Sequence, residues 1–185
     1  MKVGFIGLGT MGASIAMNAI KGGHSLVVHD VTRQAAGQHI QAGAVWAESP
    51  KAVAEQSDLI LSSLPGPPEV EAVALGQNGL VEGLARGKVY LDLSTNSPTV
   101  MRRIHAEFAK QGVEVLDGPV SGGPDGAKSG KMAIWVGGDK ATFERILPTL
   151  KSMGDQIAYV GPIGAGSVAK LVHNCAGYVV QTAMA

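Results

Sequence analysis

Short apolar runs recur along the chain, separated by longer segments whose apolar residues fall at helical spacing. The short runs predict strands at 2–6, 26–29, 44–47, 58–63, 88–93, 113–116, 132–136 and 156–160. The longer segments predict helices at 11–20, 32–41, 50–56, 68–75, 97–110 and 141–152, and a last one from 164 onward. This alternation favours an α/β fold, a doubly wound and mostly parallel sheet followed by the start of a long helix.

Turn and capping residues mark several boundaries of these elements. Thr32 and Ser49 are expected to cap the helices that follow them. The segment 117–130 is rich in glycine and is expected to form a long loop. Pro148 lies inside the helix predicted at 141–152 and is expected to bend or break it.

The composition excludes several classes of protein. Hydrophobic residues make up 45% and charged residues 16% of the 185 residues, which is typical of a globular chain and not of a disordered one. The formal net charge is zero, so the chain has no general attraction to nucleic acid or to an anionic membrane. The single cysteine, Cys175, excludes an internal disulfide framework, and the histidines show no metal-ligand spacing.

No segment has the features of a secretion signal or of a membrane-spanning helix. The N-terminus enters a predicted strand directly, and no apolar run reaches the roughly 18–20 residues that a span needs. We therefore expect a cytoplasmic protein.

A glycine-rich loop follows the first predicted strand and opens the first predicted helix. It has the form G-x-G-x-x-G and consists of Gly7, Leu8, Gly9, Thr10, Met11 and Gly12. In a dinucleotide-binding fold the first glycine permits the turn, the second lets the backbone approach the pyrophosphate, and the third packs helix against strand. The N-terminus of the helix offers free N–H groups to the phosphates. We expect this loop to bind a dinucleotide; an ordinary turn between strand and helix is the alternative.

Asp30 comes at the end of the second predicted strand, where dinucleotide-binding folds carry an acidic residue. Its carboxylate is expected to accept hydrogen bonds from the adenosine ribose, and its charge would repel a 2′-phosphate. NAD is therefore favoured over NADP as the cofactor. Arg33 lies close enough in the chain to weaken this preference by reaching a phosphate. The alternative role for Asp30 is to cap the following helix.

Five motifs in the same order resemble the β-hydroxyacid dehydrogenase family, which includes 3-hydroxyisobutyrate dehydrogenase. They are FIGLGTMGASIAMNAIKGGH, LSSLPGPPEVEAV, LDLSTNSPTVMRRI, DGPVSGGPDGAKSGKMAIWVGG and GPIGAGSVAKLVHN, and together they extend over nearly the whole chain. The resemblance implies that Leu64 and Pro65 lie along the cofactor. It also implies that Ser94 and Thr95 lie near the nicotinamide.

The resemblance assigns the acid group of the substrate to Ser121, Gly122 and Gly123. Their own chemistry agrees, because a hydroxyl and the N–H groups of glycines in a loop after a strand suit a carboxylate. A surface loop without a ligand is the alternative.

Lys170 and Asn174 are four residues apart and share a face of the last predicted helix. The apolar neighbours of Lys170 are expected to lower its pKa by desolvation, which suits proton transfer near neutral pH. The resemblance implies that Lys170 is the general acid or base and that Asn174 binds and orients the substrate. A lysine that only extends from an amphipathic helix into solvent is the alternative.

His173 departs from the family pattern, which has asparagine at this position. Lys170, His173 and Asn174 together resemble the more distant 6-phosphogluconate dehydrogenase, although the usual NADP preference of that enzyme disagrees with Asp30. His173 is therefore either a second contact to the substrate or a structural residue of the helix.

These observations predict a dinucleotide-binding domain of the Rossmann type over 1–163 and the start of an interdomain helix over 164–185. The resemblance implies NAD-dependent hydride transfer between a small β-hydroxy acid and its semialdehyde. The spacing of the histidines predicts no metal site. It also implies a second, all-helical domain and a homo-oligomer, so we expect this chain alone to bind NAD and to turn over poorly. The alternatives are a 6-phosphogluconate-type dehydrogenase and a dinucleotide-binding module without turnover.

Overall fold

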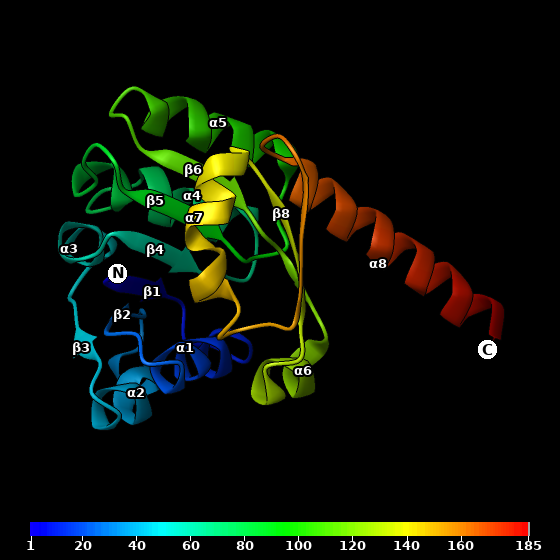
Figure 1. Cartoon of the computed structure of the whole chain (residues 1–185), viewed down its shortest axis with the longest axis horizontal. Helices are drawn as coiled ribbons and strands as arrows, with labels where there is room; N and C mark the ends of the chain where they lie inside the picture. Colours follow the sequence, from blue (N-terminus) through cyan, green and yellow to red (C-terminus); the bar gives the residue numbers. More distant parts are fainter. Residues whose placement is uncertain (185) are drawn as a thin grey trace.

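A nine-stranded sheet forms the centre of the structure, a computed structural model that describes residues 1–184 (Figure 1). The strands are β1 (Val3–Ile6), β2 (Leu26–His29), β3 (Val45–Trp46), β4 (Leu59–Ser62), β5 (Val89–Asp92), β6 (Glu114–Asp117), β7 (Val120–Ser121), β8 (Ala133–Gly137) and β9 (Gln156–Gly161). They are ordered β3-β2-β1-β4-β5-β6-β8-β7, and β9 pairs with β8. The strands from β3 to β6 in this order are all parallel, whereas β8 runs antiparallel to β6 and β7. The predicted mostly parallel sheet is thereby confirmed.

Helices cover both faces of the sheet. They are α1 (Gly12–Lys21), α2 (Gly37–Gln41), α3 (Pro50–Gln56), α4 (Pro67–Leu75), α5 (Pro98–Ala109), α6 (Gly123–Ser129) and α7 (Lys140–Leu150), with short 3-10 helices at Arg33–Ala36 and Leu80–Glu82. Apolar residues of α1, α6 and α7 pack in one core cluster, and those of α3, α4 and α5 pack in another. The chain is therefore wound on both sides of the sheet, as the alternation of elements predicted.

Successive side chains of a strand enter the two cores alternately. In β4, Leu59 and Leu61 belong to the core under α1 and α7, while Ile60 belongs to the core under α3, α4 and α5. Because both faces are covered, the strand is apolar without interruption, which explains why the short apolar runs were the signal of the strands.

The order of the strands reverses beside β1. The chain first moves from β1 to its neighbour β2 and then returns to pair β4 with the other edge of β1. The carboxyl ends of β1 and β4 therefore border a topological switch point, where open α/β sheets bind their ligands.

The structure departs from the predicted elements in three places. The segment 32–41 begins with a 3-10 helix, and the side chain of Thr32 caps neither this helix nor α2. The expected loop at 117–130 contains β7 and α6, because β7 finds a partner in β8. Pro148 does not break α7; only two residues of the helix follow it. The cap predicted at Ser49 is confirmed, since its side chain accepts a hydrogen bond from the N–H of Ala52.

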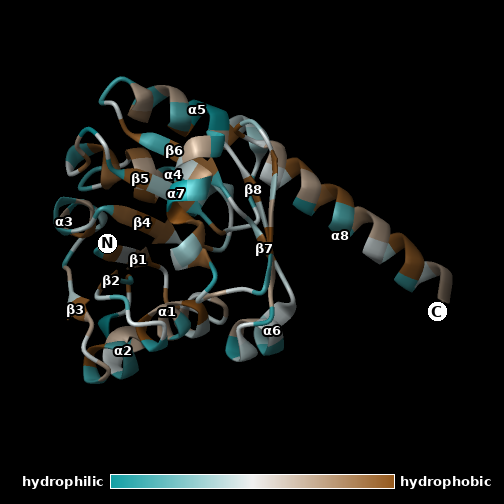
Figure 2. Ribbon diagram, viewed as in Figure 1, coloured by the Kyte–Doolittle hydropathy of each residue, from teal (hydrophilic) through white to brown (hydrophobic). Residues whose placement is uncertain are grey.

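The last helix, α8 (Ala165–Met184), projects away from the rest of the molecule (Figure 1). Its buried residues, Gly166 and Ser167, lie in the first turn. Farther along, α8 carries exposed large side chains such as Val172, Tyr178 and Val179. Figure 2 shows hydrophobic stretches, in brown, along this projecting helix. Within residues 1–184, no helix combines the length and the apolar character that a membrane crossing requires.

Candidate dinucleotide-binding and active site

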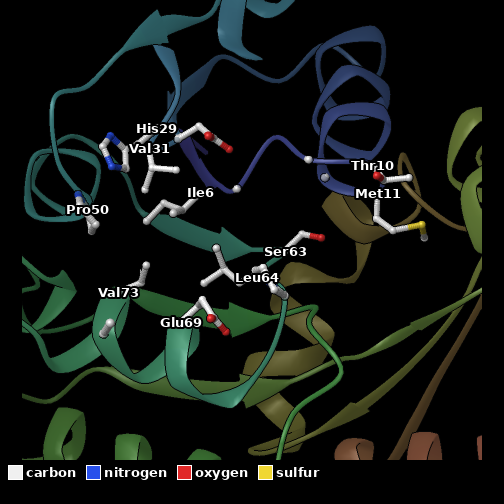
Figure 3. Close-up of a pocket in the computed structure, with 16 residues that line it drawn as sticks. Ile6, Thr10, Met11, His29, Val31, Pro50, Ser63, Leu64, Glu69 and Val73 are labelled. Carbon is white, nitrogen blue, oxygen red and sulfur yellow. The ribbon is translucent and has the colours of Figure 1, made fainter. Parts of the chain in front are cut away.

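A cavity of about 700 Å³ lies at the carboxyl ends of β1, β2 and β4 (Figure 3). The glycine loop and the start of α1 form one side of it, and the segment after β4 together with α4 forms another. The predicted cofactor residues that line it are Gly7, Gly9, Thr10, Met11, Gly12, Asp30, Leu64 and Pro65. The cavity thus brings together residues that three separate motifs had suggested.

The three glycines of the loop are needed for three different reasons. Gly7 has a φ of +90°, which side chains of L-residues rarely adopt. A Cβ on Gly12 would overlap the carbonyl oxygen of Gly7, so no side chain fits between the loop and α1. A Cβ on Gly9 would meet no protein atom within 4 Å, although Gly9 lines the cavity. The space beside Gly9 is therefore left to a ligand, as close approach of a pyrophosphate requires.

The carboxylate of Asp30 ties the end of β2 to the glycine loop. Its Oδ2 accepts a hydrogen bond from the N–H of Leu8 at 2.7 Å, and its Oδ1 accepts one from the N–H of Thr32 at 2.9 Å. Each carboxylate oxygen can accept a further hydrogen bond, so capacity remains for ribose hydroxyls. Leu8 contributes through its backbone, because its side chain is buried in the core and does not line the cavity.

Arg33 already has partners within the protein. Its guanidinium lies 3.4 Å from the carboxylate of Glu48 and 5.6 Å from the ring centroid of Trp46. Both charged side chains are largely exposed, so the ion pair is weak. These contacts nevertheless compete with a 2′-phosphate for the guanidinium.

A second cavity, of about 250 Å³, adjoins the first. Four residues line both cavities: Met11, Ser63, Leu64 and Pro65. Among the described residues that line the smaller cavity, Lys170 of α8 alone is charged. Burial lowers the pKa of Lys170, as the sequence predicted for a lysine among apolar residues. Its amine is therefore suited to proton exchange beside the dinucleotide cavity.

Ser94 lines the smaller cavity, but its hydroxyl is engaged within the protein. The hydroxyl donates to Asp92 Oδ1 at 2.6 Å and accepts a hydrogen bond from the N–H of Leu64 at 2.9 Å. Asp92 is buried, which raises its pKa, and hydrogen bonds from Ser94 and neighbouring polar groups lower it in part. Ser94 therefore joins the two loops beside the cavity, and the exposed Thr95 lines the same cavity.

Two buried aspartates near the site were missed by the sequence analysis. Asp92 is the last residue of β5 and Asp117 is the last residue of β6. Both are only 1% exposed. Asp117 carries the same signal in the sequence as Asp30, an acidic residue directly after an apolar run, whereas Asp92 lies inside the strand predicted at 88–93.

The residues predicted to bind the substrate are only partly gathered at the smaller cavity. Gly123 lines it, whereas Ser121, Gly122 and Asn174 are not among the described residues that line either cavity. Ser121 is half-buried in β7, and Gly122 is exposed with a φ of +137°. Asn174 is half-buried on α8, four residues after Lys170.

His173 packs its ring on Trp135 of β8, with the two ring centroids 4.9 Å apart. It is exposed, and the described residues that line the two cavities do not include it. Within residues 1–184 there is also no cluster of three or more histidine, cysteine or acidic side chains that could hold a metal ion.

The sheet, the glycine loop at its switch point and the acid after β2 define a dinucleotide-binding domain. Comparison with protein families agrees, because the family described as the NAD binding domain of 6-phosphogluconate dehydrogenase matches residues 2–161. The chain belongs to this family of NAD-binding domains. As the five motifs implied, the proteins to which it is similar include 3-hydroxyisobutyrate dehydrogenases.

Three known proteins illustrate this relationship. An NAD-dependent L-serine dehydrogenase from Pseudomonas aeruginosa is 40% identical over 173 residues, which cover 94% of this chain and 58% of that protein. The structure of Mycobacterium tuberculosis 3-hydroxyisobutyrate dehydrogenase with L-serine superposes with a TM-score of 0.93 at 32% identity, covering 98% of this chain and 62% of that one. The structure of Psf3 in complex with NADP+ and 2-OPP gives a TM-score of 0.89 at 32% identity, covering 94% and 62%.

The chain spans about three-fifths of the length of these relatives. The relatives include one described as NAD-dependent and one with bound NADP+, so the nicotinamide dinucleotide is common to both. The cofactor prediction is confirmed at this level, and the choice between NAD and NADP depends on the residues around Asp30.

Proposed function

We propose that this chain is the cofactor domain of an NAD-dependent oxidoreductase that transfers a hydride between the nicotinamide and a small β-hydroxy acid or semialdehyde. The observation that carries the proposal is the position of Lys170 in a small cavity that shares a wall with the dinucleotide cavity. The names of the relatives support the substrate class, since L-serine and 3-hydroxyisobutyrate are both small β-hydroxy acids.

In this proposal, NAD supplies the hydride acceptor when it is bound. Lys170 takes the hydroxyl proton of the substrate during oxidation and returns it during reduction. Burial lowers the pKa of Lys170 and so favours the neutral amine, which is the form that accepts a proton. Leu93 and Val120 are apolar parts of the cavity wall and limit the access of water to this proton transfer.

The segment from Ser121 to Gly123 binds the acid group of the substrate in this proposal. Gly122 and Gly123 both have positive φ values, +137° and +62°, so side chains are disfavoured there and the backbone N–H groups stay accessible. Asn174 shares a helical face with Lys170 and orients the substrate. We further propose that a second, helical domain and assembly into a homo-oligomer complete the enzyme.

The test follows NADH absorbance with a panel of β-hydroxy acids, semialdehydes and 6-phosphogluconate. It uses this chain and the reading frame extended through any downstream domain. We expect activity on a small β-hydroxy acid in the extended form. Binding of NAD without turnover in either form would contradict the proposal and favour a binding module.

Lys170→Ala tests the role of the lysine in the active form. It should lower kcat by about 100-fold or more, because general acid–base catalysis typically contributes that much, and should leave the affinity for NAD unchanged. Lys128→Ala is the control, since this exposed lysine of α6 lines neither cavity. An equal loss of NAD affinity and turnover in Lys170→Ala would identify a structural lysine instead.

A further inference from the structure

We propose that Asp117 is a positioning residue whose carboxylate fixes the first turn of α8 and thereby sets the place of Lys170 in the smaller cavity. The inference rests on the proposed function for the role of Lys170. That Asp117 holds α8 in place rests on its hydrogen bonds to the start of this helix.

The carboxylate of Asp117 accepts three hydrogen bonds from the start of α8. Its Oδ1 accepts one from the N–H of Gly164 at 2.7 Å. Its Oδ2 accepts one from the N–H of Ser167 at 2.6 Å and one from the hydroxyl of Ser167 at 2.7 Å. The N-terminal N–H groups of a helix have no partner within the helix and carry partial positive charge, so a carboxylate is well matched to them.

The surroundings of this carboxylate leave little room for movement. A Cβ on Gly137 would overlap Asp117 Oδ1, and a Cβ on Gly166 would overlap the backbone oxygens of Trp135 and Asp117. Asp117 and Ser167 are each only 1% exposed. The first turn of α8 is therefore pressed against β6 and β8, with the carboxylate between them.

This turn is the part of α8 that the rest of the molecule holds most closely. The buried residues of the helix are Gly166 and Ser167, and Lys170 follows three residues later at the cavity. The ring contact between His173 and Trp135 is a weaker restraint, because His173 is exposed. The direction and rotation of α8, and with them the position of the amine, are thus set at Asp117.

The variant Asp117→Asn keeps the size of the side chain but changes its hydrogen bonds. One carboxylate oxygen becomes an NH₂ group, which faces N–H donors of α8 and cannot accept from them. Ser167→Ala is a milder variant that removes one of the three hydrogen bonds. Asp139→Ala is the matched control, because Asp139 caps α7 by accepting a hydrogen bond from the N–H of Thr142 at 2.7 Å, and α7 has no residue at either cavity.

The experiment measures how Lys170 reacts with acetic anhydride as a function of pH, read by mass spectrometry. Lys128 in the same molecules is the internal standard, and unfolding temperature and NAD affinity are measured in parallel. The assay needs no turnover, so its outcome is separate from that of the proposed activity. The pH midpoint of labelling follows the pKa of the Lys170 amine. Loss of the Asp117 charge would by itself lower this pKa, so a rise in the midpoint reports that Lys170 has become less buried.

We expect the labelling midpoint of Lys170 to move to higher pH in Asp117→Asn and by a smaller amount in Ser167→Ala. Asp139→Ala should lose stability without moving this midpoint, and all three variants should keep their affinity for NAD. An unchanged Lys170 midpoint in the two α8 variants would overturn the proposal and leave Asp117 with a purely stabilising role. If Asp117→Asn does not fold, the result for Ser167→Ala decides between these outcomes.

Discussion

Three aspartates at the ends of apolar strands organise the loops around both cavities. Asp30 binds the glycine loop, Asp92 binds Ser94, and Asp117 binds the start of α8. Because the carboxyl ends of parallel strands lie at one edge of the sheet, Asp30 and Asp117 reach segments 22 and 50 residues away, whereas Asp92 holds Ser94 two residues further along the chain. At the scale of single residues, the site is therefore built by acceptors that hold backbone and hydroxyl donors in place.

Asp30→Ala should weaken the binding of NAD. The change removes the carboxylate that is expected to accept hydrogen bonds from the adenosine ribose, and with it the acceptor that holds the N–H of Leu8 beside the cavity. Hydrogen bonds to charged groups contribute about 1.5–3 kcal/mol, so the Kd for NAD should rise about 10- to 100-fold. The Kd for NADP should rise less, because the repulsion of its 2′-phosphate is also removed. Calorimetric titration measures both, with the exposed Asp155→Ala as control; equal losses for the two cofactors would refute the preference for NAD.

Asp92 should make the stability of the protein depend on pH. Its pKa is raised by burial, so between its ordinary pKa and its raised one the folded state binds more protons than the unfolded chain. The stabilising contribution of its protonated form is present below its ordinary pKa and is lost as the pH rises through the raised value.

Asp92→Asn cannot titrate, so its free energy of unfolding should improve relative to the wild type as the pH rises. Its amide also faces the side-chain amide of Asn96, which adds a penalty that does not vary with pH. The test is therefore how the difference in free energy of unfolding between Asp92→Asn and the wild type changes with pH. The constant part of this difference is not informative. Urea unfolding between about pH 4 and pH 8 measures it, and a difference that stays constant over this range would contradict the role assigned to Asp92.

At the scale of elements, the loop between β1 and α1 contains one glycine that is needed mainly for NAD binding and another that is needed also for the stability of the fold. Gly9→Ala should leave the unfolding temperature nearly unchanged, because its Cβ meets no protein atom within 4 Å, but should raise the Kd for NAD at least about 10-fold by occupying the space of the ligand. Gly12→Ala should also destabilise the fold by about 1–3 kcal/mol through overlap with Gly7. Gly37→Ala has similar open space away from the cavity and should bind NAD normally. Thermal unfolding and NAD titration of the three variants distinguish these effects; normal binding by Gly9→Ala would contradict the position of the pyrophosphate.

The same elements show what a sequence can predict here. The strands of the parallel sheet were predictable because they are apolar on both faces, and the glycine loop was predictable because its chemistry is local. The segment 117–130 was not, since β7 exists only through its pairing with β8. Asp30 and Asp117 accept hydrogen bonds from residues that lie 22 and 50 positions away in the chain. Partners so distant in sequence cannot be identified from the sequence pattern. Of the residues predicted for catalysis and substrate binding, Lys170 and Gly123 line the smaller cavity, and the roles of all of them stay predictions.

At the scale of the whole molecule, the two halves of α8 contribute differently. Its first turn is buried against β6 and β8, whereas residues 175–184 are all exposed. An exposed helical segment without buried apolar contacts adds little to folding stability. The body of the molecule should therefore fold and bind NAD without the outer half of the helix.

Deletion of residues 175–185 should leave the unfolding temperature and the affinity for NAD within error of those of the full chain. Deletion from residue 165 onward should lower the unfolding temperature, because it removes Ser167 from Asp117 and uncovers the backbone of β6 and β8. Because the described residues that line the larger cavity all precede residue 165, NAD should still bind to whatever fraction stays folded. Thermal unfolding with and without NAD measures both deletions. A large loss of stability in the shorter deletion would mean that the outer half of α8 packs on the body in solution, and that Asp117 is not the principal restraint on the helix.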